Sequence, residues 1–235
     1  TESRRKAKES LLLHDIAVVC RALYERDSRE SFCHPSLWLG PLTEEGRDKL
    51  NVTPSLARHF IVGAKAEGIE FNSARSVTAN LLTVSPQCFR FDDRVALYRE
   101  IVALDKEMGG WNKAPAFGGP IPSRVTIRRN FLIEDALGQV AKLGRATKGR
   151  IEVTFVNEAG LAEAGLDHGG LVKEFLEEFA KKCFDPNLAL FRSTDDGCLH
   201  PSPLAEHQDN GLPLLYLVGM VIGKCLYEGI MLDVK

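Results

Sequence analysis

The amino-acid sequence predicts a mainly α-helical protein with a small β component, that is, an α+β fold. Apolar residues recur at helical spacing through the first half of the chain. In the second half, short runs alternate between apolar and polar residues, as half-buried strands do. With 235 residues, 44% of them hydrophobic and 26% charged, the chain could hold one large domain or one domain with a helical extension.

The first helix is predicted from a stripe of apolar residues near the start of the chain. Its members are mostly three or four positions apart, which places them on one face of a helix. We expect this face to be buried in a core. The stripe consists of Leu12, Ile16, Val19, Cys20 and Leu23.

Further helical signals follow before a loop. Thr53 is a capping residue, and Pro54 after it suits the first helical position. Ser73–Val84 has a helical apolar face, and a later helix ends at the glycine pair that begins with Gly109. The proline- and glycine-rich stretch Gly110–Ser123 predicts a linker. We therefore divide the chain into a helical extension at 1–110, a linker at 111–123 and a domain at 124–235.

The domain at 124–235 mixes strands and helices. Arg124–Arg128 and Ile151–Phe155 are predicted strands, and Phe131–Leu143 is a predicted helix between them. The sequence Asp195–Gly197 reads as a hairpin turn. Pro213–Leu232 closes the chain as a long helix.

Composition and charge exclude several classes of function. A net charge of −2 gives no electrostatic reason to expect nucleic acid or an anionic membrane as a partner. The most apolar stretch, Leu212–Ile222, is shorter than the roughly 20 residues of a membrane span, so it predicts a buried helix. The 6 cysteines contain no CxxC pair, and we expect no metal site and no cofactor. Without a secretory signal, we expect an intracellular, cytoplasmic protein, with the nucleus left open.

The stretch Phe155–Leu176 is the most informative part of the chain, because a glycine- and acid-rich loop joins a strand to a helix there. Gly160 and Gly165 have the spacing of a phosphate-binding P-loop. However, Leu166 and Asp167 stand where that loop needs Lys and Ser or Thr, and the acidic residues would repel a nucleotide. We therefore expect a structural loop.

Within this loop, Asp167 is predicted to cap the helix that follows. Its carboxylate can accept hydrogen bonds from the exposed N–H groups of the first turn and suits the positive end of the helix dipole. Gly160, Gly165, Gly169 and Gly170 are expected at positions of positive φ or close backbone approach. The outward charges of the helix, spaced one turn apart, predict a solvated face.

Two further patterns are predicted to be structural. Arg128 and the arginine after it lie close in the sequence to Glu134 and Asp135, and we expect an ion pair that links strand to helix. Gly219 and Gly223 form a GxxxG pair on the last helix, which is expected to mark a close crossing of two helices.

The block Phe155–Leu176 resembles the glycine-and-acid signature in the front lobe of HECT-type ubiquitin ligases. A second block, Val218–Asp233, is similar to a helix later in the same lobe, and two blocks in the right order are more specific than one. The similarity is densest from about Val125 to Val234. Upstream, Arg21–Gly40 and Phe91–Val102 look closest to the branch of the family that includes the human ligase E3B and its plant counterparts.

The resemblance implies that residues 124–235 are the large subdomain of a HECT N-lobe, truncated, behind a helical extension. In HECT ligases the acceptor cysteine lies in the rear lobe, typically preceded by Thr and followed two residues later by Asn. None of the 6 cysteines here has that context, so we expect no catalytic residue and an inactive isolated chain. The whole protein would accept ubiquitin from a conjugating enzyme as a cysteine thioester and transfer it to lysines of a protein substrate.

Two other functions remain open from the residues alone. One is a non-catalytic helical protein-interaction module. The other is a cysteine hydrolase, for which Cys33 with His34 and Cys198 with His200 are the neighbouring pairs. Adjacency in sequence does not make a catalytic pair. A Thr-Cys-x-Asn sequence downstream would decide for the ligase.

Overall fold

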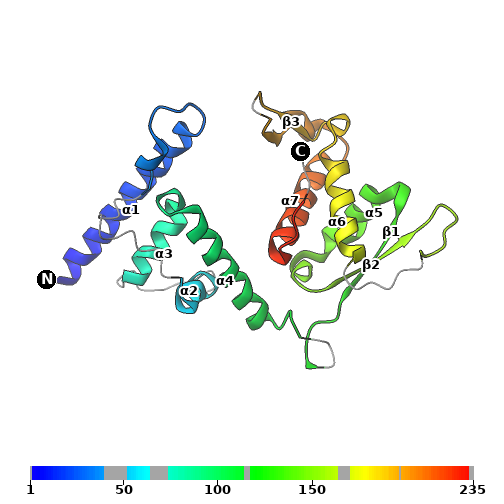
Figure 1. Ribbon diagram of the computed structural model, residues 1–235, viewed down its shortest axis with the longest axis horizontal. Helices are drawn as coiled ribbons and strands as arrows, with labels where there is room; N and C mark the ends of the chain where they lie inside the picture. The colour runs from blue at the N-terminus through cyan, green and yellow to red at the C-terminus, as the bar shows by residue number, and fades with distance from the viewer. Residues whose placement is uncertain are drawn as a thin grey trace. The chain divides into compact units, whose positions relative to one another are not determined.

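The structure is a computed structural model that describes residues 2–39, 52–63, 74–113, 117–163, 170–195 and 197–232. The chain forms two compact units, Thr1–Gly109 and Gly110–Lys235 (Figure 1). In its described part the first unit is helical, and the second combines helices with two pairs of short strands. The predicted class, mainly α with a small β component, is confirmed.

The first unit is built from helices around a small apolar core. The predicted cap at Thr53 is confirmed, because its Oγ1 accepts the N–H of Leu56 at 3.1 Å. Gly110 follows the last helix with a φ of +66°, the left-handed conformation that commonly ends a helix. The elements are α1 (Glu2–Asp27), α2 (Pro54–Gly63), α3 (Ala74–Val84) and α4 (Phe91–Gly109), with 3-10 turns at Pro35–Leu37 and Pro86–Cys88. The core consists of Leu56, Ala57, Ile61, Ala79, Leu82, Leu97 and Leu104.

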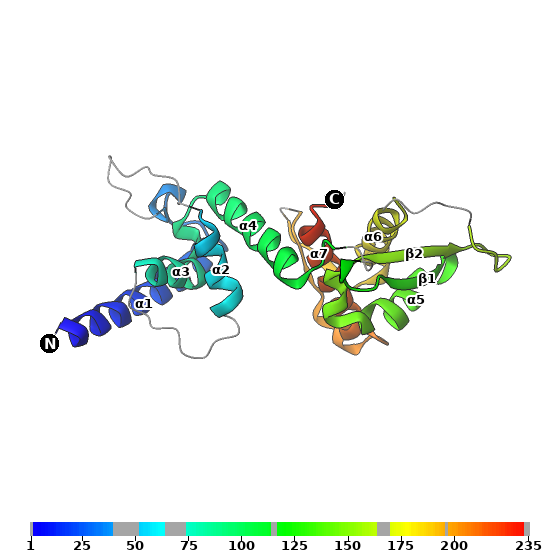
Figure 2. The same cartoon turned by 90° about the horizontal axis from the view of Figure 1, so that it is seen from below.

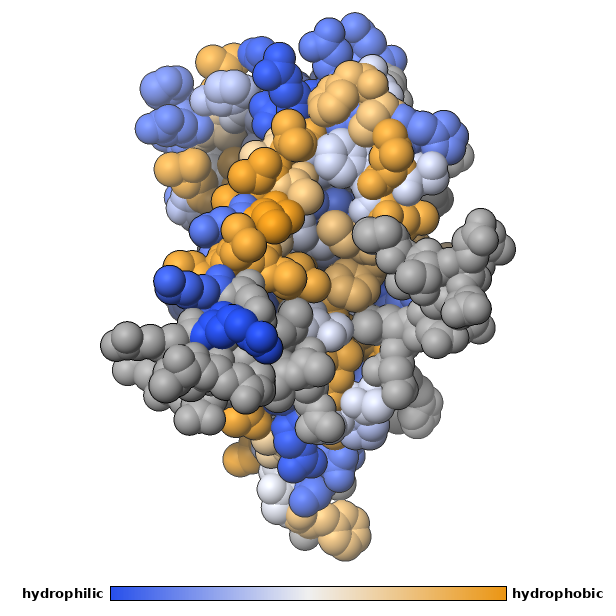
Figure 3. Space-filling view, turned by 90° about the vertical axis from the view of Figure 1, so that its left-hand side faces the viewer, coloured by the Kyte–Doolittle hydropathy of each residue, from blue (hydrophilic) through white to orange (hydrophobic). Residues whose placement is uncertain are grey.

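The apolar stripe of α1 was expected in the core, and this prediction is wrong. Cys20 is half-buried, but the larger members are between 46% and 60% exposed: Leu12, Ile16, Val19 and Leu23. Instead, α1 is held through Ala17, whose carbonyl oxygen accepts the Ser85 hydroxyl at 2.9 Å. Ala17 lies on another part of the helix circumference, so this contact leaves the stripe uncovered by the described residues. Figure 3 looks onto the side from which α1 projects and shows apolar residues at the surface.

The second unit contains a parallel pair of strands that lie side by side (Figure 2). These are β1 (Ser123–Arg128) and β2 (Ile151–Val156), and both predicted strands are confirmed. The register places Val125 opposite Val153 and Ile127 opposite Phe155. These four side chains are at most 2% exposed, so the alternating pattern buries one face of the pair.

The helix between the strands is shorter than the sequence predicts. Instead of Phe131–Leu143, α5 spans Leu132–Gln139 and continues as a 3-10 segment, η5 (Val140–Lys148). Gly144 interrupts η5 with a φ of 52° and a ψ of −123°. Apolar spacing is nearly the same for the two kinds of helical turn over so short a stretch, so the pattern did not locate the boundary.

Side chains of α5 cover the outer edge of β1. The Oε1 atom of Gln139 accepts the Thr126 N–H at 3.0 Å, and its Nε2 donates to the Thr126 carbonyl oxygen at 2.7 Å. Asp135 Oδ2 accepts the Arg128 N–H at 2.8 Å. Because an unpaired strand edge invites pairing with another chain, these bonds protect this edge of the two-stranded sheet.

The predicted hairpin is confirmed by an antiparallel pair, β3 (Phe191–Ser193) and β4 (Leu199–Pro201). In its turn, Gly197 has a φ of +82°, and its N–H donates to the carbonyl oxygen of Thr194 at 2.9 Å. A glycine is suited to that left-handed position. The 3-10 turns Pro186–Leu188 and Pro203–His207 flank the hairpin.

Two long helices complete the second unit, α6 (Gly170–Cys183) and α7 (Gly211–Glu228). Among the described helices, α7 is the one long and apolar enough to cross a membrane, and 39% of its 18-residue window is buried in the fold. Core helices commonly pass the same test of length and composition. The main core consists of Val125, Ile127, Leu132, Ala136, Val140, Ile151, Val153, Phe155, Phe175, Leu176, Phe179, Cys183, Leu190, Ala205, Leu214, Leu217, Val218, Val221 and Cys225.

The GxxxG pair of α7 does not mark a close crossing in this part of the chain, and that prediction is wrong for the described residues. A methyl group built on Gly219 or Gly223 would meet no atom within 4 Å. Both glycines lie on the exposed side of the helix. The close approach that buries a glycine is found at Gly211, where such a methyl carbon would lie 1.8 Å from the Ala205 carbonyl oxygen.

Candidate functional site

The chemistry of the signature region centres on Arg129, which opens a 3-10 turn, η4 (Arg129–Phe131), directly after β1. The turn changes the direction of the chain and places the guanidinium 4.2 Å from the centre of the Phe155 ring, on the neighbouring strand. A planar guanidinium stacks well on an aromatic face and leaves its N–H groups free to bind at its edge. The stacking on Phe155 therefore helps to orient the Arg129 guanidinium.

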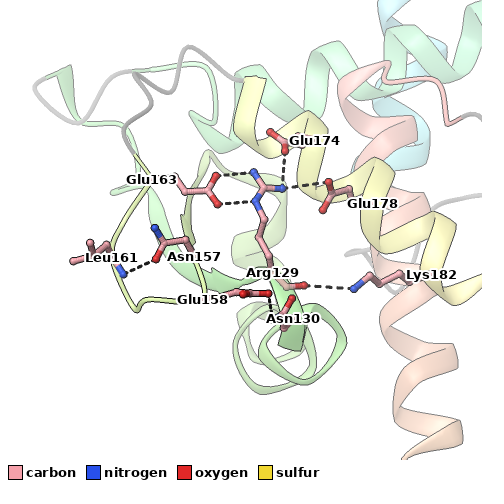
Figure 4. A network of polar contacts seen from close by, with 9 residues as sticks. All are labelled: Arg129, Asn130, Asn157, Glu158, Leu161, Glu163, Glu174, Glu178 and Lys182. Carbon is pink, nitrogen blue, oxygen red and sulfur yellow. Dashed lines mark hydrogen bonds and ion pairs between the residues drawn. The ribbon is translucent and has the colours of Figure 1, made fainter.

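Three carboxylates bind this guanidinium (Figure 4). Glu163 binds in bidentate fashion, with Nε–Oε1 and Nη2–Oε2 distances of 2.7 Å. Glu174 lies 2.8 Å from Nη1, and Glu178 lies 3.3 Å from the same atom. Glu163 follows β2, whereas Glu174 and Glu178 stand one turn apart on α6. Arg129 therefore joins the strand pair to α6.

The face of α6 that carries these acids was expected to be simply solvated. The Lys173–Glu177 pair is present at 3.7 Å, in agreement with helical i,i+4 spacing. Glu178, however, turns to Arg129, and Lys182 Nζ donates to the carbonyl oxygen of Arg129 at 3.4 Å (Figure 4). Part of the charged face is thus a contact surface within the unit.

The loop after β2 is held by a second set of bonds. Asn157 pairs with Leu161 through its backbone N–H, at 3.0 Å, and its Oδ1 atom accepts the Leu161 N–H, also at 3.0 Å. Gly160 has a φ of +77°, as expected for a turn glycine. Asn130 Nδ2 donates to Glu158 Oε1 at 2.9 Å, which ties η4 to the same loop (Figure 4). The turn after β1 and the loop after β2 are therefore bonded to each other.

The predicted signature residues are placed as follows. Gly165, Asp167 and Gly169 lie outside the described residues. Gly170 is the first residue of α6, is exposed, and would meet no atom within 4 Å if it carried a methyl group. The expectation of positive φ or tight packing is therefore wrong for Gly170, because an open first helical turn accepts any ordinary side chain.

Arg128 forms the expected link between strand and helix, but with Asp135. Its Nη2 and Nε atoms lie 2.7 Å and 3.0 Å from the two oxygens of Asp135, and its guanidinium lies 4.5 Å from the Phe131 ring centre. Glu134 contributes to the electrostatics of Arg128 as a nearby charge. Helical spacing explains why Arg128 pairs with Asp135 and not with Glu134, since Asp135 faces β1 whereas Glu134 is exposed.

The cluster of Arg129 with Glu163, Glu174 and Glu178, here named the Arg129 hub, was not predicted. The sequence pattern had grouped Arg129 with the acidic residues of α5. A signal existed: two glutamates one turn apart on α6 and a third, Glu163, before that helix. Sequence spacing could not say that Arg129, 34 positions from Glu163, would lie between them.

Hydrogen bonding and charge fix the ionisation of this hub. The hydrogen bonds from Arg129 hold the pKa of Glu163 below its usual range. The bonds that Arg129 donates to Glu163, followed by its contact with the Glu174 carboxylate, raise the pKa of Arg129 above its usual range. A guanidinium that is permanently charged and held by three carboxylates can neither exchange a proton nor attract an anionic substrate. The arrangement supports the loop rather than performing a reaction.

Two cysteines of the second unit, Cys183 and Cys225, are buried in its core. Burial raises the pKa of Cys183 to about 12 and also raises that of Cys225, so both thiols stay protonated. These two are packing residues of the core. Cys198 is exposed on the hairpin turn. Across the described ranges, no group of three or more His, Cys, Asp and Glu side chains is arranged to hold a metal ion.

Comparison with known families decides the family of the chain. A profile of the HECT-domain (ubiquitin-transferase) matches residues 177–235, from the middle of α6 through α7. The chain belongs to the HECT family. The resemblance predicted from the two sequence blocks is therefore confirmed.

Several relatives of this HECT chain are named ubiquitin ligases. Human Ubiquitin-protein ligase E3B is 36% identical over 214 residues, which are 90% of this chain and 18% of that protein. Probable E3 ubiquitin protein ligase C167.07c of Schizosaccharomyces pombe is 40% identical over 144 residues, 61% of this chain and 14% of that protein. E3 ubiquitin-protein ligase UPL6 of Arabidopsis thaliana is 32% identical over 183 residues, 77% of this chain and 16% of that protein. The HECT chain thus spans less than a fifth of the length of these relatives.

Proposed function

We propose that these 235 residues are part of a longer HECT ubiquitin ligase and serve as scaffold within it. The parent polypeptide would accept ubiquitin from a conjugating enzyme as a cysteine thioester and pass it to lysines of a protein substrate. The observation that carries this proposal is the alignment with Ubiquitin-protein ligase E3B over 90% of the chain, together with the HECT-domain match.

The scaffold role is supported by the chemistry of the chain itself. Cys183 and Cys225 are buried in the core with raised pKa values, whereas transthiolation needs an accessible thiolate. None of the 6 cysteines stands between a preceding Thr and an Asn two residues later. The acceptor cysteine of the parent would therefore come from another part of that polypeptide.

A charging assay tests both parts of the proposal. The 235-residue chain and the parent polypeptide are each incubated with ubiquitin, activating enzyme, ATP and a panel of conjugating enzymes, then resolved on non-reducing gels. We expect a thiol-sensitive ubiquitin adduct on the parent and none on the 235-residue chain. An adduct on one of the 6 cysteines would overturn the scaffold role, and a parent without any adduct would overturn the ligase.

One observation favours a second candidate, a non-catalytic helical interaction module. The stripe of α1 exposes Leu12, Ile16 and Val19 by more than half in each case, and exposed apolar faces of this kind often bind other proteins. The same charging assay separates the candidates. A module gives no adduct on any polypeptide that contains these residues, whatever its length.

A further inference from the structure

The apolar stripe of α1 has the spacing of a seam between two helices. Leu12, Ile16, Val19 and Leu23 follow one another in steps of four, three and four residues. Alternating steps of three and four keep side chains on one narrow line along a helix, where a second helix can pack against them. Leu12 is 60% exposed, Ile16 53%, Val19 57% and Leu23 46%, so this line is open among the described residues.

The helix that presents the stripe is anchored from another part of its circumference and at its end. The carbonyl oxygen of Ala17, a residue 4% exposed, accepts the hydroxyl of Ser85. Beyond the last turn, Asp27 Oδ1 accepts the N–H of Phe32 at 2.7 Å, and its Oδ2 accepts the indole N–H of Trp38 at 2.7 Å. A partner that binds the stripe therefore meets a formed helix, which lowers the entropic cost of association.

The stripe matches itself when two copies of α1 run in opposite directions. Its steps of four, three and four read the same from either end. An antiparallel pair therefore places Leu12 against Leu23 of the second copy and Ile16 against Val19 of the second copy. The twofold axis repeats both contacts. An interface between identical chains around such an axis needs a surface that is complementary to itself, and the stripe meets this condition.

Charged residues at the two ends of the stripe favour the antiparallel direction. Arg26 follows Leu23 by three residues, and Glu9 precedes Leu12 by three residues, so both positions continue the seam. In an antiparallel pair, position 26 of each copy faces position 9 of the other, which brings opposite charges together. In a parallel pair, each position would face the like charge of its own counterpart, which is unfavourable.

We propose that the stripe of α1 is a self-association surface, at which α1 pairs antiparallel with α1 of a second copy of this chain. Mirror-related spacing and mirror-related charges serve no purpose against an unrelated helix, and this favours a second copy over a different partner. The inference goes beyond the proposed ligase function and is independent of it, because the pairing of two helices involves no ubiquitin transfer.

Two adjacent valines test the surface. Val19 belongs to the stripe, whereas Val18, which is 46% exposed, lies about 100° away around the helix. We expect the 235-residue chain to form a concentration-dependent dimer in sedimentation equilibrium. Val19→Asp should weaken this dimer at least about tenfold, because the twofold axis buries two carboxylates without partners. Val18→Asp is the matched control and should leave the dissociation constant nearly unchanged. Circular dichroism checks that both variants keep their helices.

A chain that stays monomeric at every concentration would overturn the proposal, and a segment of the parent polypeptide would then be the occupant of the stripe. A dimer that both valine variants weaken equally would also overturn it. Disulfide trapping tests the direction. Copies carrying Leu12→Cys are mixed with copies carrying Leu23→Cys and oxidised, and the linked peptides are identified by mass spectrometry. We expect links between positions 12 and 23, whereas links of position 12 to position 12 would overturn the antiparallel pairing.

Discussion

The Nζ atom of Lys224 lies 2.8 Å from the carbonyl oxygen of Gly149, a residue 75 positions away in the sequence. The lysine side chain is 5% exposed, and its second partner is Glu228 Oε1, at 2.7 Å. A methyl group built on Gly149 would lie 3.1 Å from the Trp111 ring. Three segments therefore meet at Gly149: the end of η5, the segment before β1 and the helix α7.

Breaking the Lys224 contact is expected to be costly. Lys224→Ala would leave the Gly149 carbonyl oxygen without the Lys224 donor and would remove the ion pair between Lys224 and Glu228, so the free energy of unfolding should fall by about 2–3 kcal/mol. Lys224→Met retains the apolar stem and should cost less. Urea denaturation followed by circular dichroism measures both. Lys173→Ala, at an exposed pair, is the control and should change stability by less than about 0.5 kcal/mol.

The Arg129 hub should matter far more than an ordinary surface pair. Arg129→Lys keeps the charge but loses the bidentate geometry and the stacking on Phe155, so we expect a loss of about 1–2 kcal/mol. Arg124→Lys is the matched control, because the Arg124 side chain is 87% exposed and pairs with Glu152 at 3.2 Å. It should be nearly neutral. Equal effects in thermal unfolding would show that the hub does not support the fold.

The same ion pairs predict how stability depends on pH. The pKa values of Glu163 and Asp135 are lowered, chiefly by hydrogen bonds from Arg129 and Arg128. Such a carboxylate stabilises the fold above its unfolded pKa of about 4, and this contribution is lost as the pH falls through the lower folded pKa. We expect the contribution to be complete at pH 5–7 and to decline below about pH 4.

A variant makes this pH dependence specific. Arg129→Gln should return the pKa of Glu163 towards its ordinary value, so stability should be lower at pH 7 and should change less between about pH 4.5 and 3. Urea midpoints at a series of pH values measure the slope. Arg124→Gln should retain the slope of the unmodified chain, and an unchanged slope in the Arg129 variant would contradict the assignment.

The cysteines should differ sharply in reactivity. Burial raises the pKa of Cys183 to about 12, so its thiol stays protonated at pH 8, and burial blocks access as well. Cys198 is exposed and should react first with iodoacetamide in the folded chain. Cys183 and Cys225 should react only after addition of denaturant. Peptide mass spectrometry after timed quenching gives the order, and early labelling of Cys183 would show that the core is open.

Two glycines at helix starts should respond in opposite ways to alanine. Gly211→Ala places a methyl carbon 1.8 Å from the Ala205 carbonyl oxygen, so backbone must move and we expect a loss of more than about 3 kcal/mol. Gly170→Ala meets no atom within 4 Å and should be neutral or stabilising. Thermal melts of the two variants provide the comparison. A severe effect at Gly170 would mean that the preceding loop packs on it.

Local signals in the sequence were sufficient for much of this fold. The Thr53 cap, the alternating patterns of β1 and β2 and the turn at Gly197 each depend on residues within a few positions of each other, and all are confirmed. The proposed cap at Asp167 stays a prediction, as its position lies outside the described residues. The predicted end of α5, at Leu143, was wrong because α-helical and 3-10 turns space their apolar residues too similarly over this length.

By itself, the sequence determined the fold class, most of the elements and the HECT signature, because periodicity, caps and motifs are properties of neighbouring residues. Tertiary structure decided which apolar faces are covered and which charges meet. The stripe of α1 and the glycines of α7 carry patterns typical of packing, yet they are exposed in this part of the chain. Arg129 bonds to Glu163, 34 positions away, and not to the nearer acids of α5. Burial and pairing depend on what a distant segment brings into contact, and a periodic pattern contains no information about that segment.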